Sequence, residues 1–93
     1  MPFLVQMANI GSEIERTILW KDKNREDYSG QAFMRAVELL DLTIADGKNR
    51  DRLRELTRLR EMLADFFVFD NRYRSSAQAW KNYFAPFFFA ARR

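Results

Sequence analysis

The stretch QAFMRAVELLDLTIAD, residues 31–46, constrains the fold more than any other part of this chain. Its apolar side chains recur with helical spacing at positions 33, 36, 37, 40 and 44, and positions 32, 39 and 42 widen that stripe. Only Arg35, Glu38 and Asp41 remain as a narrow polar strip. A helix that is apolar over most of its circumference needs neighbours on several sides, so this helix is expected in the middle of a bundle.

A first helix is predicted before this central one. Ser12 and Glu15 form a capping box, which indicates a helix over roughly 12–24 after an N-terminal arm of residues 1–10. Residues 24–30 are expected to form a turn or a frayed entry into the central helix.

Two more helices follow the central one. Gly47 is a suitable C-cap for it, and Asn49 is the expected N-cap of a third helix that stops near residues 69–71. Ser75 and Gln78 then form a second capping box for a short fourth helix.

Pro86 disfavours helical backbone at the residue before it, so the fourth helix is expected to end near residue 84. Residues 86–93 would then form a separate aromatic tail. With 93 residues and no period-two alternation, the chain is predicted to be a single all-α domain. We expect a small antiparallel bundle of three long helices plus a short C-terminal helix.

The segment KNREDYSGQAFMRAVELLDLTI, residues 23–44, resembles the helical hairpins of tetratricopeptide repeats and of MIT domains. In those families a helix ends near a tyrosine-containing turn, and a second helix packs small residues back against it. Tyr28, Ala32, Ala36 and Leu40 stand at such positions. The resemblance covers residues 12–67 at most and implies a similar packing with a peptide-binding groove.

The composition argues against catalysis. The chain has no histidine and no cysteine, which removes the commonest general base and the commonest transition-metal ligands. It also has no glycine-rich phosphate loop. Two carboxylate pairs share helix faces, Glu38 with Asp41 and Glu61 with Asp65, and such pairs could hold a divalent cation. The favoured interpretation is that Glu38 pairs with Arg35 and Glu61 with Arg58 in exposed salt bridges. We therefore expect no catalytic residue, no cofactor and no metal.

Charge is divided unevenly along the chain. Residues 1–47 hold five basic and eight acidic side chains, whereas residues 48–93 hold eleven and five. The favoured interpretation is that the two halves pack as complementary surfaces, and the alternative is a nucleic-acid face. The candidate residues of that face are Arg50, Arg54, Arg58, Arg72 and Arg74.

The segment DNRYRSS, residues 70–76, is open to two interpretations. It could be a recognition loop, because rigid scaffolds often carry function on their connections. The favoured alternative is a capped turn in which Asp70 or Asn71 accepts backbone hydrogen bonds and Tyr73 covers the edge of the core.

The C-terminal sequence WKNYFAPFFFAARR is rich in aromatic residues. One or two of them suffice to close the core, so the phenylalanines after Pro86 are predicted to be in excess and to dock against another copy of the chain. A different protein or, less favoured, a membrane surface facing Arg92 and Arg93 are the alternatives. The predicted interface residues are Trp80, Tyr83, Phe84, Phe87, Phe88 and Phe89.

These features predict a non-catalytic, homo-oligomeric protein–protein interaction module. The alternative is a nucleic-acid-associated accessory protein that uses the arginine-rich third helix. The lack of cysteine, of a signal peptide and of a stretch of about 20 apolar residues favours a cytoplasmic location without a transmembrane segment.

Overall fold

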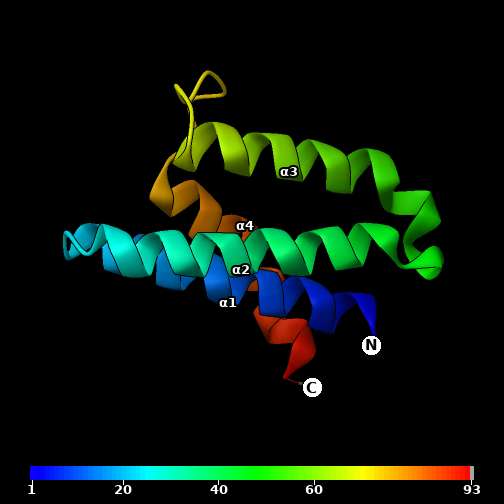
Figure 1. Cartoon of the computed structure of the whole chain (residues 1–93). Coiled ribbons are helices and arrows are strands. Elements are labelled where there is room, and N and C mark those ends of the chain that lie inside the picture. Colours follow the sequence, from blue (N-terminus) through cyan, green and yellow to red (C-terminus); the bar gives the residue numbers. More distant parts are fainter. Residues whose placement is uncertain (93) are drawn as a thin grey trace.

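The computed structural model describes residues 1–92 and confirms the predicted all-α fold (Figure 1). Its α-helices are α1 (Phe3–Asp22), α2 (Glu26–Ala45), α3 (Leu53–Phe67) and α4 (Ala77–Ala91). A short 3₁₀ helix, η1 (Gly47–Arg52), joins α2 to α3. The helices α1 and α2 lie side by side, α3 packs chiefly on α2, and α4 crosses behind α2 to pack on α1 (Figure 1).

Helix α1 begins at Phe3, nine residues earlier than the sequence predicts. The prediction of an N-terminal arm over residues 1–10 is therefore wrong. Ser12 is not the N-cap, and its hydroxyl donates to the carbonyl oxygen of Ala8 at 3.1 Å instead. The physical reason is burial: Met7 and Ile10 continue the apolar stripe of the helix and are fully buried in the core. Pro2, which needs no N–H partner, stands at the start of the helix.

Helix α2 begins at Glu26, so most of the turn or frayed entry expected over residues 24–30 is helical, and Tyr28 lies inside α2 rather than in a turn. Ala32, Ala36 and Leu40 of α2 are buried. Near the turn that joins the two helices, the hydroxyl of Ser29 donates to the carbonyl oxygen of Thr17 at 2.9 Å. This buried hydrogen bond fixes the register of the two helices.

The corner between α2 and α3 differs from the prediction. Asn49 is not an N-cap but a buried linker, whose Nδ2 donates to the carbonyl oxygen of Thr43 at 2.9 Å and to Oε1 of Gln6 at 3.0 Å. Asp46 rather than Gly47 is the C-cap of α2, and Gly47 has no positive φ. The Asn49 side chain therefore does not cap α3, because it forms a long-range hydrogen bond to Gln6 of α1.

Helix α4 also differs from the prediction. Its N-cap is Ser76, not Ser75, because the hydroxyl of Ser76 accepts from the N–H of Ala79 at 3.1 Å. The helix continues through Pro86 to Ala91, so the predicted end near residue 84 and the separate tail are wrong. Residue 93, the last of that predicted tail, lies outside the described residues.

In the part of the chain that the structure describes, no helix is both long and apolar enough to cross a bilayer.

Candidate functional site

The aromatic residues of α4 divide into buried and exposed members. Trp80 and Phe84, predicted as interface residues, are instead buried and close the core of the chain itself. Phe87 and Phe88 are half-buried and pack against that core, and the Phe87 ring meets the ring of Phe3 edge-on at 6.3 Å. These two phenylalanines are therefore not in excess, contrary to the prediction. Phe89 is the exception, because 74% of its surface is exposed.

Phe89 lies beside an open hollow of about 450 Å³. Its other lining residues are Leu4, Pro86 and Ala90, so α1 and α4 both contribute. No ionisable side chain lines this Phe89 hollow, and Leu4 is itself 43% exposed. The arrangement suits an apolar group and offers no chemistry beyond binding.

A second hollow, of about 220 Å³, opens between α3 and α4, and we call it the α3–α4 groove. Its lining residues are Glu55, Arg58, Leu59, Met62, Trp80 and Tyr83. The groove exists because α3 packs chiefly on α2 and α4 chiefly on α1, which leaves the two helices apart beyond their connecting loop (Figure 1). Burial raises the pKa of the Tyr83 phenol, and the nearby charge of Glu55 raises it further.

Trp80 has an unusual environment at the base of this groove. Its indole Nε1–H is shielded from solvent and has no hydrogen-bond partner within residues 1–92. An unpaired buried donor costs about 1–3 kcal/mol of stability. A ligand that supplied an acceptor to the indole N–H would recover part of this cost.

The loop after α3 is a capped turn, as favoured from the sequence. Asn71 holds Ser75 from both sides, accepting from its N–H at 2.8 Å and donating to its carbonyl oxygen at 2.9 Å. The second anchor was not predicted: Asp65 accepts from the backbone N–H groups of Arg72 and Tyr73 at 2.8 and 3.0 Å. Asn71 and Arg74 have φ values of 53° and 54°, a conformation that only such an anchored loop maintains.

Sequence reasoning missed Asp65 as a loop anchor, although a signal was present. A carboxylate in the last turn of a helix faces the negative end of the helix dipole and is unfavourable there. Asp65 occupies such a position, and it is buried with only 8% of its surface exposed. Its placement is explained by the two loop N–H groups that it accepts.

Of the five arginines predicted to form a basic face, Arg58 lies next to the loop that carries Arg72 and Arg74. The guanidinium of Arg58 lies 5.7 Å from the centre of the Tyr73 ring, so α3 and the loop that carries Arg72 and Arg74 meet at this point. Arg54 lies one turn before Arg58 on α3, and Arg50 lies earlier still in η1. Within residues 1–92 none of these five arginines forms an ion pair with a carboxylate.

The acidic residues pair differently from the prediction. Neither Glu38 nor Glu61 forms an ion pair within the described chain. Asp41 instead accepts from Nε of Arg60 at 2.7 Å, which joins α2 to α3, and this hydrogen bond raises the pKa of the guanidinium. Among residues 1–92 no group of three carboxylates is close enough to hold a metal ion.

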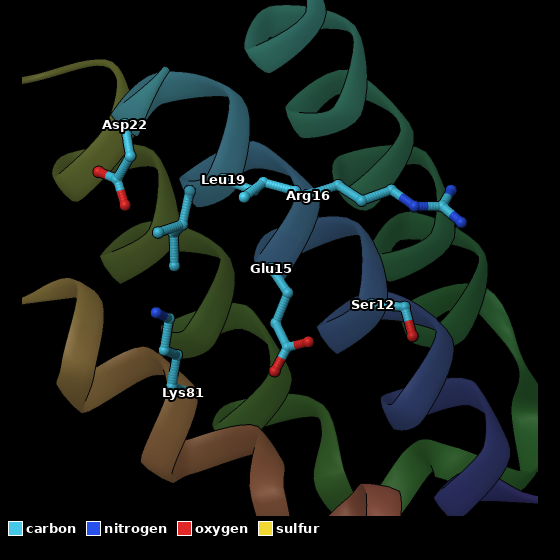
Figure 2. A pocket seen from close by; sticks show the side chains of 7 residues that line it. Ser12, Glu15, Arg16, Leu19, Asp22 and Lys81 are labelled. Carbon is cyan, nitrogen blue, oxygen red and sulfur yellow. The ribbon is translucent and has the colours of Figure 1, made fainter. Parts of the chain in front are cut away.

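A third hollow, of about 560 Å³, lies between α1 and the first turns of α4 (Figure 2). The amine of Lys81 points toward Leu19 and Asp22, whereas Ser12 points away from it (Figure 2). The hydroxyl of Ser12 donates to the carbonyl oxygen of Ala8. The serine and the lysine of this hollow therefore do not form a Ser–Lys pair.

Comparisons of this chain with protein families, with curated proteins and with solved structures found no match. The resemblance to tetratricopeptide and MIT hairpins rests on the residues of the α1–α2 hairpin alone. The two apolar hollows and the arginines beside one of them are therefore the candidate sites of this chain.

Proposed function

We propose that this protein is a non-catalytic protein–protein interaction module that associates with itself through the Phe89 hollow. The observation that supports this most directly is the exposure of Phe89 next to an open apolar hollow on the same patch. Contiguous exposed apolar surface is typical of interaction sites, and Phe89 forms such a surface together with the apolar lining of the hollow.

A second copy of the chain is the partner that this patch suits best. Because Phe89 and the hollow lie next to each other, a two-fold axis through the patch would place the ring of each copy on the hollow of the other. A phenylalanine buries about 150–250 Å², whereas a stable interface buries about 1,200–2,000 Å² in total. The patch supplies only part of that area, so we expect a reversible dimer whose population rises with protein concentration.

The test compares two single substitutions by light scattering coupled to size exclusion. Phe89→Ser should shift the mass toward that of the monomer. Phe69→Ser is the matched control, because Phe69 is 71% exposed on the loop after α3. Point variants are preferable to a truncated chain, since Phe87 and Phe88 pack on the core. If the wild-type chain stays monomeric at high concentration, or if both variants dissociate equally, the proposal is wrong.

Two further expectations belong to this proposal. The cytoplasmic location predicted from the composition stays a prediction that cell fractionation would check. The alternative role beside nucleic acid also stays a prediction, and titration with a mixed-sequence single-stranded oligonucleotide tests it.

A further inference from the structure

The α3–α4 groove is separate from the Phe89 hollow and has a different character. Its base is aromatic and aliphatic, formed by Leu59, Met62, Trp80 and Tyr83. A closed apolar cavity of about 150 Å³ accepts a benzene ring, so the roughly 220 Å³ of this groove can accept one large apolar side chain.

The lining of the groove carries one arginine, Arg58, and one carboxylate, Glu55, and the loop beside Arg58 carries two further arginines. Arg58 lines the groove and also lies over the ring of Tyr73, which connects the groove to the loop. Arg72 and Arg74 flank Tyr73 in the sequence, and the buried carboxylate of Asp65 fixes the backbone of that loop. Since no carboxylate of residues 1–92 pairs with these arginines, their charge is available to a ligand.

We infer that the α3–α4 groove binds an acidic peptide segment that carries one large apolar side chain. The apolar side chain enters the groove, and flanking carboxylates pair with Arg58 and the loop arginines, whose guanidinium forks match a carboxylate in geometry. Charge complementarity favours an acidic peptide, because an uncharged or basic peptide offers no carboxylate to pair with the arginines.

Trp80 adds a hydrogen-bond donor to this argument. Its Nε1–H lacks a partner, and a backbone carbonyl of a bound peptide is an acceptor of the required kind. Because the N–H is shielded from solvent, the carbonyl reaches it only when the side chains that cover it move. Binding should therefore change the environment of this indole.

A peptide suits the groove better than a nucleic acid does. Glu55 lines the groove together with Arg58, and its carboxylate repels a phosphate chain that follows the wall. A peptide can direct its carboxylates to the arginines and only its apolar side chain toward the groove. The alternative remains distinguishable, because a nucleic acid binds through many phosphates and depends steeply on salt.

The experiment is an NMR titration of the full chain carrying Trp20→Phe, which leaves Trp80 as the source of the indole N–H signal. The probe is a short acetylated peptide with a Phe-Leu pair between runs of glutamate. Saturable shifts are expected at the Trp80 indole and at the amides of Arg72 and Tyr73. A peptide with Ser-Ser in place of Phe-Leu should bind at least about tenfold more weakly, because it leaves the groove empty.

A charge reversal tests the arginines beside the groove. Arg58→Glu should weaken binding about tenfold or more, whereas Arg35→Glu, the same change on the exposed surface of α2, should leave it unchanged. Arg72→Glu provides a second variant outside the helices. The inference is overturned if the Ser-Ser peptide binds as well, if Arg35→Glu weakens binding equally, or if the shifts lie elsewhere. It is also overturned if a mixed-sequence single-stranded oligonucleotide binds this surface more tightly than the peptide.

Discussion

At the scale of single residues, Gly11 shows how one missing side chain sets the position of a helix. A Cβ atom built at Gly11 would lie 2.8 Å from ring atoms of Phe84, which is closer than van der Waals contact allows. The absence of that atom lets α4 cross close to α1, and Phe84 fills the space as one of the largest fully buried side chains. Gly30, within α2, has no atom near the same position.

The first prediction compares these two glycines. Gly11→Ala should lower the free energy of unfolding by about 1–3 kcal/mol, because the methyl group overpacks the contact with Phe84. Gly30→Ala should raise it by up to about 1 kcal/mol, because alanine is the better helix former and meets open space. Urea denaturation followed by circular dichroism measures both. Equal effects of the two changes would contradict the close α1–α4 crossing.

A second residue-scale prediction concerns Tyr83 and pH. Burial raises the pKa of Tyr83 above its ordinary value of 10.0, so the phenol loses its proton more readily in the unfolded chain. Its contribution to stability is therefore complete below pH 10.0 and is lost as the pH rises through the higher folded-state pKa. The free energy of unfolding should fall as the pH rises above 10.0 in the wild type, and it should fall less in Tyr83→Phe. Parallel curves for the two proteins would refute the assignment.

At the scale of elements, the predicted helices form, and the predictions fail at the ends of the helices. The stretch of residues 31–46 forms most of α2, which packs on α1 and α3, but its apolar stripe is narrower than predicted because Leu42 is 67% exposed. Ser12 and Asn49 were assigned as caps from local pattern, but each bonds elsewhere. A cap is worth only about 1 kcal/mol, so burial of Met7 and Ile10 easily extends α1 past Ser12.

Helix α4 gives the third prediction, because Pro86 lies inside it. Proline lacks the N–H that would bond to the carbonyl oxygen four residues earlier, and inside a helix it costs about 3 kcal/mol relative to alanine. Pro86→Ala should therefore raise the free energy of unfolding by about 1–3 kcal/mol. Pro2→Ala, at the start of α1, should be nearly neutral. A destabilised Pro86→Ala would mean that the proline ring is needed for packing beside Phe89.

The loop between α3 and α4 gives the fourth prediction. Asp65→Ala leaves the N–H groups of Arg72 and Tyr73 without their acceptor, at a cost of about 1–3 kcal/mol. Hydrogen exchange at these two amides should become faster, whereas Asp70→Ala, an exposed change in the same loop, should leave them protected. Unchanged exchange in Asp65→Ala would show that the loop does not depend on this anchor.

At the scale of the whole molecule, charge and apolar surface are separated. The Phe89 hollow, at the α1 and α4 side, has no ionisable lining residue, whereas Arg58 and Glu55 line the α3–α4 groove. One ion pair, between Arg60 of α3 and Asp41 of α2, joins the basic half of the chain to the acidic half. Arg54, Arg58, Arg72 and Arg74 have no such partner within residues 1–92, which leaves this face basic.

The fifth prediction uses salt to separate the two surfaces. Raising the ionic strength from about 0.05 to 0.5 M shortens the Debye length to a few ångströms. Self-association through the Phe89 hollow should stay constant or strengthen, because no charges meet there. Binding of the acidic peptide should weaken. Light scattering and the peptide titration, each at both salt levels, measure these effects, and a dimer that dissociates in salt would place the interface elsewhere.

The sequence by itself determined that the chain is all-α and that residues 31–45 belong to one amphipathic helix. These properties follow from the spacing of apolar residues along one helix, which is local information. Only the tertiary structure decided that α1 begins at Phe3, that α4 continues through Pro86, and that Phe87 and Phe88 are covered while Phe89 is not. The α3–α4 groove also belongs to this second group, because a hollow is set by where two helices diverge. Such features depend on burial energies between residues far apart in the chain, and these outweigh the capping and proline signals that sequence reasoning uses.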